Sequence, residues 1–213
     1  MTIIDQALEG IAMGKTSYAQ QMLSRIENTR DGSAFIVSDF TDIMDYSTAK
    51  RTLTRLAERG SVRRVIRGVY DKPRYSTLLE EQSAPIVEEI AYALARNYNW
   101  TIAPSGAAAL NLLGLSTQVP GKWKFISSGP YKTYTFGKVT IEFLHRANRE
   151  IAGMSKMTAL VIQALKAIGK NNLDENTVEK LKLRLTEEDK ARLLTEARQT
   201  TAWIYAVIKE LCT

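Results

Sequence analysis

The chain has 213 residues, 45% of them hydrophobic and 24% charged, which suits either one large domain or two small ones. One cysteine, Cys212, and one histidine, His145, exclude an intrachain disulfide and zinc sites of the finger, ribbon or metalloprotease type. The sequence has neither an apolar run of about 18 residues nor a secretory signal, so we expect a cytoplasmic protein without a membrane span. We also expect no catalytic site, metal or cofactor, because a serine or cysteine triad would have to recruit His145.

Two amphipathic segments open the chain. Apolar residues recur at helical spacing over residues 2–12, which predicts a short helix. Ser17 is placed to cap a second helix, and a turn-rich stretch separates that helix from a short apolar run at 34–37. Ser38 is placed to cap a further short helix. Helices therefore dominate the predicted start of the chain.

The next predicted helix has an apolar side and a basic side. Ser47 is placed to cap it, and Gly60 ends it in a position that favours a left-handed residue. The segment 61–66, a tight turn at 67–68 and a short returning segment predict a β-hairpin, or wing. Helix, helix, turn, helix and hairpin follow the order of a winged helix-turn-helix DNA-binding domain, which we place at residues 1–75. One buried stripe is predicted along the last helix, formed by Ala49, Leu53, Leu56 and Ala57.

The remaining residues, 76–213, predict an α+β domain with a mostly helical C-terminal end. A connector at 76–82 leads to a helix from Pro85 to about Tyr98, and Ser105 is placed to cap a compact Ala-rich helix. The fold class of the whole chain is therefore α+β. Strands are predicted at 122–127, 133–136 and 139–143, and helices at 157–168, 177–185, 187–197 and 202–211.

Basic residues are concentrated between Ser47 and Arg74. This stretch holds nine Lys and Arg against two Asp and Glu, a local charge of +7, while the whole chain carries +6 and the other residues together −1. A local excess of this kind predicts a local anionic partner, and the phosphates of DNA fit the helix-turn-helix order. The alternative is a solvated basic face without a partner. Because the stretch contains few aromatic residues for stacking on unpaired bases, duplex DNA is favoured over single-stranded RNA.

The candidates for DNA contact lie opposite the apolar stripe and in the wing. Arg51 and Arg55 are expected nearest the bases, because the guanidinium fork matches two acceptors of guanine at once. Arginines of the wing are expected to reach a neighbouring phosphate or the minor groove. Each of these residues, taken singly, is equally consistent with an ordinary solvated side chain. The full candidate set is Ser47, Thr48, Lys50, Arg51, Thr54, Arg55, Arg63, Arg64 and Arg67.

The second region contains weaker indications of chemistry. Free N–H groups after Ser105 and Gly106 could hold an anion, but a purely structural capping serine is favoured. Glu142 and His145 lie three residues apart, which on a strand means opposite faces and argues against an acid–base pair. A further set of lysines could form a second nucleic-acid contact, a face for an acidic partner or a solvated strand face. These are Lys122, Lys124, Lys132 and Lys138.

Part of the second region resembles a known family. Residues 104–120 read P-S-G-A-A-A-L-N-L-L-G-L-S-T-Q-V-P, and they follow a wing that ends R-R-V-I-R-G-V-Y. Together with F-I-S-S-G-P and V-T-I-E-F-L-H-R-A further on, this sequence is similar to the AbiEi-type antitoxins of type IV toxin–antitoxin, or abortive infection, systems. The similarity covers nearly everything from Ser17 to about His145, and the helical tail more loosely.

The resemblance implies a protein with two functions. Its N-terminal domain would repress its own operon by binding an operator with inverted repeats, and its C-terminal domain would act as an antitoxin. The functional partner would be a nucleotidyltransferase-like toxin, which such antitoxins often counter without forming a stable complex. The segment 2–12 is an addition to the family pattern, and such a helix could pack within one chain or across a homodimer.

Two other hypotheses remain open from the sequence. The first is a stand-alone winged-helix transcriptional regulator whose C-terminal domain binds a ligand or a protein. The second is an enzyme acting on nucleic acid or nucleotides, which would need clustered carboxylates to hold magnesium. The dense acidic candidates for such a cluster are the pairs at 80–81 and 88–89, and the second pair is expected on the solvent side of a helix.

Overall fold

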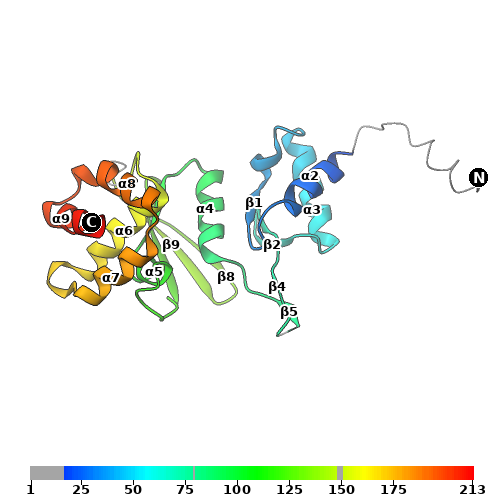
Figure 1. Cartoon of the computed structure of the whole chain (residues 1–213). Helices are drawn as coiled ribbons and strands as arrows, with labels where there is room; N and C mark the ends of the chain where they lie inside the picture. Colours follow the sequence, from blue (N-terminus) through cyan, green and yellow to red (C-terminus); the bar gives the residue numbers. More distant parts are fainter. Residues whose placement is uncertain (1–16, 79, 148–150) are drawn as a thin grey trace, which may run out of the picture. The chain divides into compact units, whose positions relative to one another are not determined.

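The computed structural model describes residues 17–78, 80–147 and 151–213. The chain forms two compact units, the first ending at Pro85 and the second beginning at Ile86, and each has its own hydrophobic core (Figure 1). Helices and sheets occur together, which confirms the predicted α+β class. The helix predicted over residues 2–12 lies outside the described residues.

In its described residues, the first unit combines two α-helices with a small antiparallel sheet. Its sheet has the strand order β1-β3-β2, so the returning strand of the hairpin lies in the middle. A second hairpin, β4–β5, occupies part of the segment that was predicted to be a connector. The elements are α2 (Tyr18–Glu27), β1 (Ala34–Ile36), the 3-10 helix η1 (Val37–Phe40), α3 (Tyr46–Glu58), β2 (Arg63–Ile66), β3 (Val69–Asp71), β4 (Tyr75–Ser76) and β5 (Glu81–Gln82).

Helix α3 packs against the core of the first unit through its apolar side. Ala49, Leu53 and Leu56 are buried and Ala57 is half-buried, so the predicted stripe is confirmed. They pack with Met22, Ile26 and Phe40 among others in one cluster. Because this stripe faces the core, the opposite side of α3 is left to solvent.

Two of the predicted helix caps in this unit are wrong, while that of α2 is confirmed. Ser17 accepts a hydrogen bond from Gln20 N in a capping box. At α3 the cap is Asp45, whose Oδ1 accepts from Thr48 N at 3.0 Å, and Ser47 lies inside the first turn. Ser38 lies within η1, where Ile36 N donates to the carboxylate of Asp39 instead. Asp and Ser are both good capping residues, so sequence preference did not separate neighbouring candidates.

The second unit is built on a mixed four-stranded sheet. The strand order is β6-β7-β9-β8, with β7 and β9 parallel and the other neighbours antiparallel. The strands are β6 (Ile102–Ser105), β7 (Lys122–Ser127), β8 (Lys132–Phe136) and β9 (Val139–His145). The helices are α4 (Val87–Asn97), α5 (Ala107–Leu112), α6 (Lys156–Ile168), α7 (Glu175–Arg184), α8 (Glu187–Glu196) and α9 (Ala202–Leu211), with 3-10 turns η3 (Lys170–Asn172) and η4 (Ala197–Gln199).

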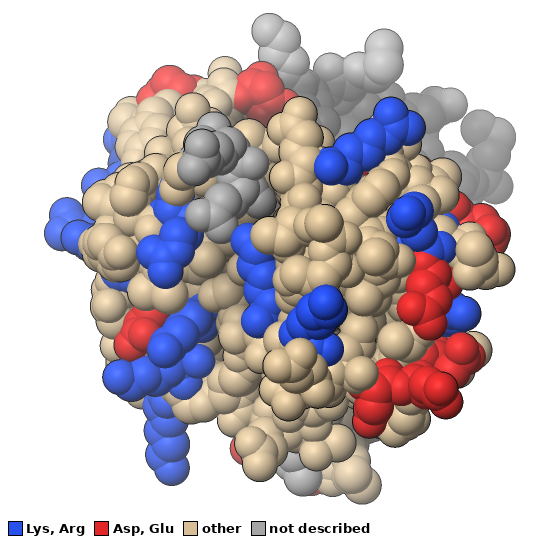
Figure 2. Space-filling view, turned by 90° about the vertical axis from the view of Figure 1, so that its left-hand side faces the viewer, with Lys and Arg blue, Asp and Glu red and all other residues tan. Residues whose placement is uncertain are grey.

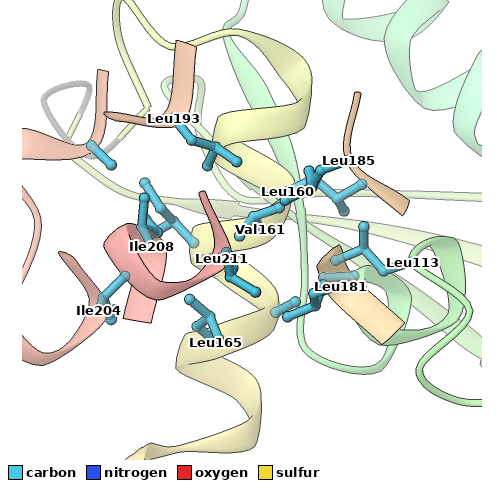
Figure 3. Packing of buried hydrophobic residues seen from close by; sticks show 14 of the residues in the cluster. Leu113, Leu160, Val161, Leu165, Leu181, Leu185, Leu193, Ile204, Ile208 and Leu211 are labelled. Carbon is cyan, nitrogen blue, oxygen red and sulfur yellow. The ribbon is translucent and has the colours of Figure 1, made fainter. Parts of the chain in front are cut away.

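Helix α6 joins the sheet to the C-terminal helices. On one side Ala159 packs with Ala103 and Ile126 of the sheet. On the other, Leu160, Val161 and Leu165 meet side chains from α7, α8 and α9 (Figure 3). Every residue from 158 to 165 is buried, which explains why this helix is apolar nearly all round. The C-terminal helices thus complete the core of the second unit.

The predicted cap of the Ala-rich helix is also wrong. Ser105 is the last residue of β6, it is only 9% exposed, and its hydroxyl donates to Lys124 O at 3.4 Å. Gly106 occupies the N-cap position of α5 with a φ of 58°, a left-handed conformation that favours glycine. Because α5 is a helix of only six residues, we propose no anion site at its start.

Candidate nucleic-acid interface

The exposed side of α3 carries a shallow surface hollow. Five of the nine sequence-predicted candidates line it together, namely Ser47, Lys50, Arg51, Thr54 and Arg55. Glu58 is the remaining lining residue and contributes a negative charge at the C-terminal end. The side chains that line the hollow lie on one side of α3 because, on each turn, their positions fall between those of the buried stripe.

Hydrogen bonds hold the polar groups at the start of this surface. The guanidinium of Arg51 donates to Thr48 Oγ1 at 3.4 Å, which fixes one end of a flexible side chain. Ser47 Oγ donates to Asp45 Oδ1 at 2.6 Å. Hydrogen bonds from Ser47 and Thr48 hold the pKa of the Asp45 carboxyl well below its usual range. Asp45 therefore stays ionised at the N-terminus of α3, where the helix dipole favours a negative charge.

The basic side chains of the hollow are free of acidic partners. Lys50, Arg51 and Arg55 are exposed, and none of them makes an ion pair with any residue that the structure describes. Cations that make no ion pair remain available to an external anion, although the charge of Glu58 at the end of the hollow reduces that attraction. This distinguishes α3 from α8, where Lys190 and Arg192 are paired with glutamates of the same helix.

Two further candidates lie on the β2–β3 hairpin, outside the hollow. Arg64 is exposed on β2, and Arg67 is exposed in the turn beside Gly68, which has a φ of 83°. The pairing of β2 with β3 shifts register between Arg64 and Ile66, an irregularity of the bulge type. Both arginines are also without an acidic partner among the described residues.

Arg63 makes hydrogen bonds inside the first unit instead. Its Nε and Nη2 donate to the carboxylate of Asp71 at 3.0 and 2.6 Å, and its Nη1 donates to Ser83 O at 2.9 Å. The Asp71 side chain is 0% exposed, so the arginine neutralises a buried charge. The expected DNA contact by Arg63 conflicts with this geometry, and we leave the residue out of the proposed interface.

A second basic residue of the stretch is used inside the unit. Lys72 Nζ donates to the carbonyl oxygens of Glu27 and Thr29 at 2.9 and 3.0 Å, at the C-terminal end of α2. It also forms an ion pair with Asp31 at 2.9 Å. The nine basic residues of the stretch thus divide into two with internal partners and an exposed remainder. The exposed ones are Lys50, Arg51, Arg55, Arg59, Arg64, Arg67 and Arg74.

Sequence reasoning missed two residues at the start of α3. Asp45 caps the helix, as described above, and Tyr46 is its first residue with 54% of its surface exposed. The spacing of the buried residues alone did not indicate which of Asp45 and Ser47 begins the helix.

The candidates of the second unit do not form a comparable site. Glu142 makes an ion pair with Lys122 at 3.3 Å, and His145 Nδ1 lies 3.0 Å from Gly129 O, so each has a separate partner. Lys124, Lys132 and Lys138 are exposed. On the face seen in Figure 2, basic side chains are separated by uncharged ones, and acidic side chains lie mostly toward the right-hand edge.

The acidic pairs at 80–81 and 88–89 belong to no metal-binding cluster among the described residues. Within the described ranges, no group of three or more His, Cys, Asp and Glu side chains is arranged to hold a metal ion. Glu88 and Glu89 are half-buried in the first turn of α4. Of the helices that the structure describes, none combines the length and apolar character needed to cross a bilayer.

Comparisons with known proteins place most of the chain in one family. The model of a family described as "Family of unknown function (DUF6088)" matches residues 21–193. A search of curated proteins found no match. Among solved structures, the chain is similar to the RV2827C protein from Mycobacterium tuberculosis, with a TM-score of 0.39 and 15% sequence identity over 92% of this chain and 76% of that one. A likeness at this level carries no argument about function.

Proposed function

We propose that this chain, which belongs to the DUF6088 family of unknown function, is a DNA-binding protein that uses α3 as a recognition helix. In this proposal the first unit is a winged helix-turn-helix, with α3 in the major groove and the β2–β3 hairpin as the wing. The observation that carries it is the exposed side of α3, where Lys50, Arg51 and Arg55 gather without an acidic partner among the described residues. A groove-sized helix with this polarity suits a polyanion.

The distribution of acidic residues in the first unit supports the same proposal. Up to Pro85 the sequence has twelve Lys and Arg against eleven Asp and Glu, so the unit as a whole is nearly neutral. Several of the acids are bound elsewhere: Asp42 by Arg25, Asp71 by Arg63 and Asp31 by Lys72. The basic character of α3 and the hairpin is therefore a local feature of the surface, which is what a docking face for phosphates requires.

Replacement of both central arginines tests this function. The double variant Arg51→Ala, Arg55→Ala should lose binding to duplexes selected by the wild type from a library with a randomised centre, because the base-reading and nearest phosphate contacts go together. The matched control is Arg198→Ala, an exposed arginine of the second unit, which should bind as the wild type does. Unchanged binding by the double variant, with its circular dichroism intact, would show that α3 is not the recognition helix.

We further propose that the protein is an AbiEi-like antitoxin that represses its own operon. The support is the sequence similarity over residues 104–120 and the strands after it, which lie in the second unit. This proposal requires a neighbouring gene for a nucleotidyltransferase-like toxin, and in growth assays co-expression of the protein should rescue cells from that toxin. The Arg51→Ala, Arg55→Ala variant should still rescue, since neutralisation is assigned to the other unit. Absence of rescue by the wild type would instead favour the stand-alone regulator.

A further inference from the structure

One side chain in the centre of the α3 hollow differs in chemistry from its neighbours. Thr54 is exposed and lies two turns after Ser47 along α3, with Lys50 and Arg51 before it and Glu58 after it. The other lining residues are serine, lysine, arginine and glutamate. Thr54 therefore supplies the one methyl group among the six described residues that form this surface.

The hydroxyl of Thr54 is turned away from any external partner. Its Oγ1 donates to Lys50 O at 2.9 Å, the backbone carbonyl four residues earlier in the helix. Threonine in a helix often adopts this arrangement, which fixes its first side-chain torsion. Because the hydroxyl is bonded to the helix backbone, the Cγ2 methyl is the group of this exposed side chain that is left to meet a partner. The hollow thus offers a small apolar group among the basic side chains of Lys50, Arg51 and Arg55.

An apolar point on a recognition helix has a defined counterpart in the major groove. Thymine presents its C5-methyl group there, and none of the other three bases has a methyl at that position. A threonine methyl against a thymine methyl removes apolar surface of both from water. The flanking arginines match the two acceptors of guanine, and a guanidinium does not detect the methyl group that marks thymine.

Resting on the proposed DNA-binding function, we infer that Thr54 is a specificity-determining residue that recognises a thymine through its 5-methyl group. The preferred site then contains a T·A pair flanked by G·C pairs that Arg51 and Arg55 read. The hydroxyl of Thr54 positions the methyl and makes no contact with the base.

The test removes one methyl group at a time from either side of the contact. The wild-type chain first selects duplexes from a library with a randomised centre, and the enriched duplex is resynthesised with each thymine replaced in turn by deoxyuridine. Affinities are then measured for the wild type and two variants. Thr54→Ser keeps the hydroxyl and loses the methyl, while Thr54→Val keeps a methyl and loses the hydroxyl.

The expected pattern is specific. At one thymine position, deoxyuridine weakens wild-type binding about fourfold, the effect of one buried methyl group. Thr54→Val retains this difference, and Thr54→Ser binds the thymine and uracil duplexes equally. Circular dichroism checks that both variants keep the helix content of the wild type.

Two kinds of failure are distinguishable. If a sequence is enriched but no thymine position responds to deoxyuridine, or if Thr54→Ser keeps the response, the methyl contact is overturned while DNA binding stands. If no sequence is enriched at all, the proposed function itself fails, and the inference fails with it.

Discussion

Arg63 and Arg64 are neighbours in the sequence with the same charge, yet their surroundings differ. Arg63 binds the buried carboxylate of Asp71 through two hydrogen bonds, whereas Arg64 is exposed. Removal of one partner from a buried pair leaves an uncompensated charge, which is more destabilising than the loss of the attraction alone. One residue of the pair thus serves the fold, and the other remains available to a ligand.

We predict that alanine substitutions at Arg63 and Arg64 have different effects on stability. Arg63→Ala should lower the free energy of unfolding by about 3 kcal/mol, because Asp71 is left buried without its partner. Arg64→Ala, the control at the adjacent position, should change it by less than about 0.5 kcal/mol. Urea-induced unfolding followed by circular dichroism measures both. Equal destabilisation by the two variants would contradict the assignment of Asp71 to Arg63 alone.

The sequence indicated this cluster of arginines but not which of them is internal. A regular hairpin closed at Arg67-Gly68 would place Arg64 opposite Asp71. The register shift between Arg64 and Ile66 moves the pairing by one residue, so Arg63 faces Asp71 instead. A bulge of this kind has no clear signature in V-R-R-V-I-R, a stretch of basic and β-branched residues without strict alternation, and the pairing of Arg63 with Asp71 depends on it.

At the scale of elements, the start of α3 decides how the candidate interface is presented. The N–H of Thr48 and the hydroxyl of Ser47 both donate to Asp45 Oδ1. The cap therefore satisfies a backbone group that would otherwise lack a partner and orders the first turn next to the hollow. Because these bonds favour the ionised carboxylate, the cap makes helix stability depend on pH.

The variant Asp45→Ala should unfold at a lower urea concentration than the wild type, with a difference that depends on pH. Hydrogen bonds from Ser47 and Thr48 lower the pKa of Asp45 in the folded state. The contribution to stability is therefore fully present above the unfolded pKa of aspartate, about 3.9, and is lost as the pH falls through the folded pKa. Unfolding midpoints measured from pH 7 down to acid should converge between wild type and variant.

A control two residues further on distinguishes the two possible caps. Ser47→Ala removes a hydrogen bond to the carboxylate but leaves the Thr48 N–H bonded to Asp45, so its effect on the unfolding midpoint at neutral pH should be smaller. A larger loss from Ser47→Ala than from Asp45→Ala would restore the cap that the sequence first suggested.

Most elements were predictable because hydrophobic periodicity fixed them. Strand β7 and helix α9 occur at the residues expected, and β9, α6 and α8 differ by a few residues at their ends. The β4–β5 hairpin was missed because its strands have two residues each and show no alternation. Element types thus followed from patterns along the chain, whereas the choice between nearby capping residues and the pairing of two-residue strands did not.

At the scale of the whole molecule, the two units differ in how they carry charge. From Ile86 onward the sequence has seventeen Lys and Arg against twelve Asp and Glu, so most of the net charge lies in the second unit. Its basic side chains are spread over the surface seen in Figure 2. The first unit is nearly neutral but concentrates exposed cations on α3 and the hairpin. Net charge therefore favours the second unit as the site for DNA, whereas the local concentration of exposed cations favours the first.

The boundary between the two units could not be placed from sequence composition. The contacts place the boundary between Pro85 and Ile86, beyond the predicted end of the first domain at residue 75. Ser83 belongs with the first unit because its carbonyl accepts a hydrogen bond from Arg63. The linker that composition suggested near 76–82 thus includes most of the β4–β5 hairpin, and Ser83 directly after it contacts a residue twenty positions earlier.

The salt dependence of DNA binding tests which unit faces the phosphates. Each phosphate neutralised on duplex DNA contributes about 0.9 to the slope of log affinity against log salt, so contacts from α3 and the hairpin predict a slope of several units. The double variant Lys50→Ala, Arg64→Ala should reduce its magnitude by about 2. Lys132→Ala, Lys138→Ala removes the same charge from the second unit and should leave it unchanged. If the second pair reduced the slope and the first did not, the DNA-binding surface would belong to the C-terminal sheet, and local concentration of cations on α3 would not be the decisive feature.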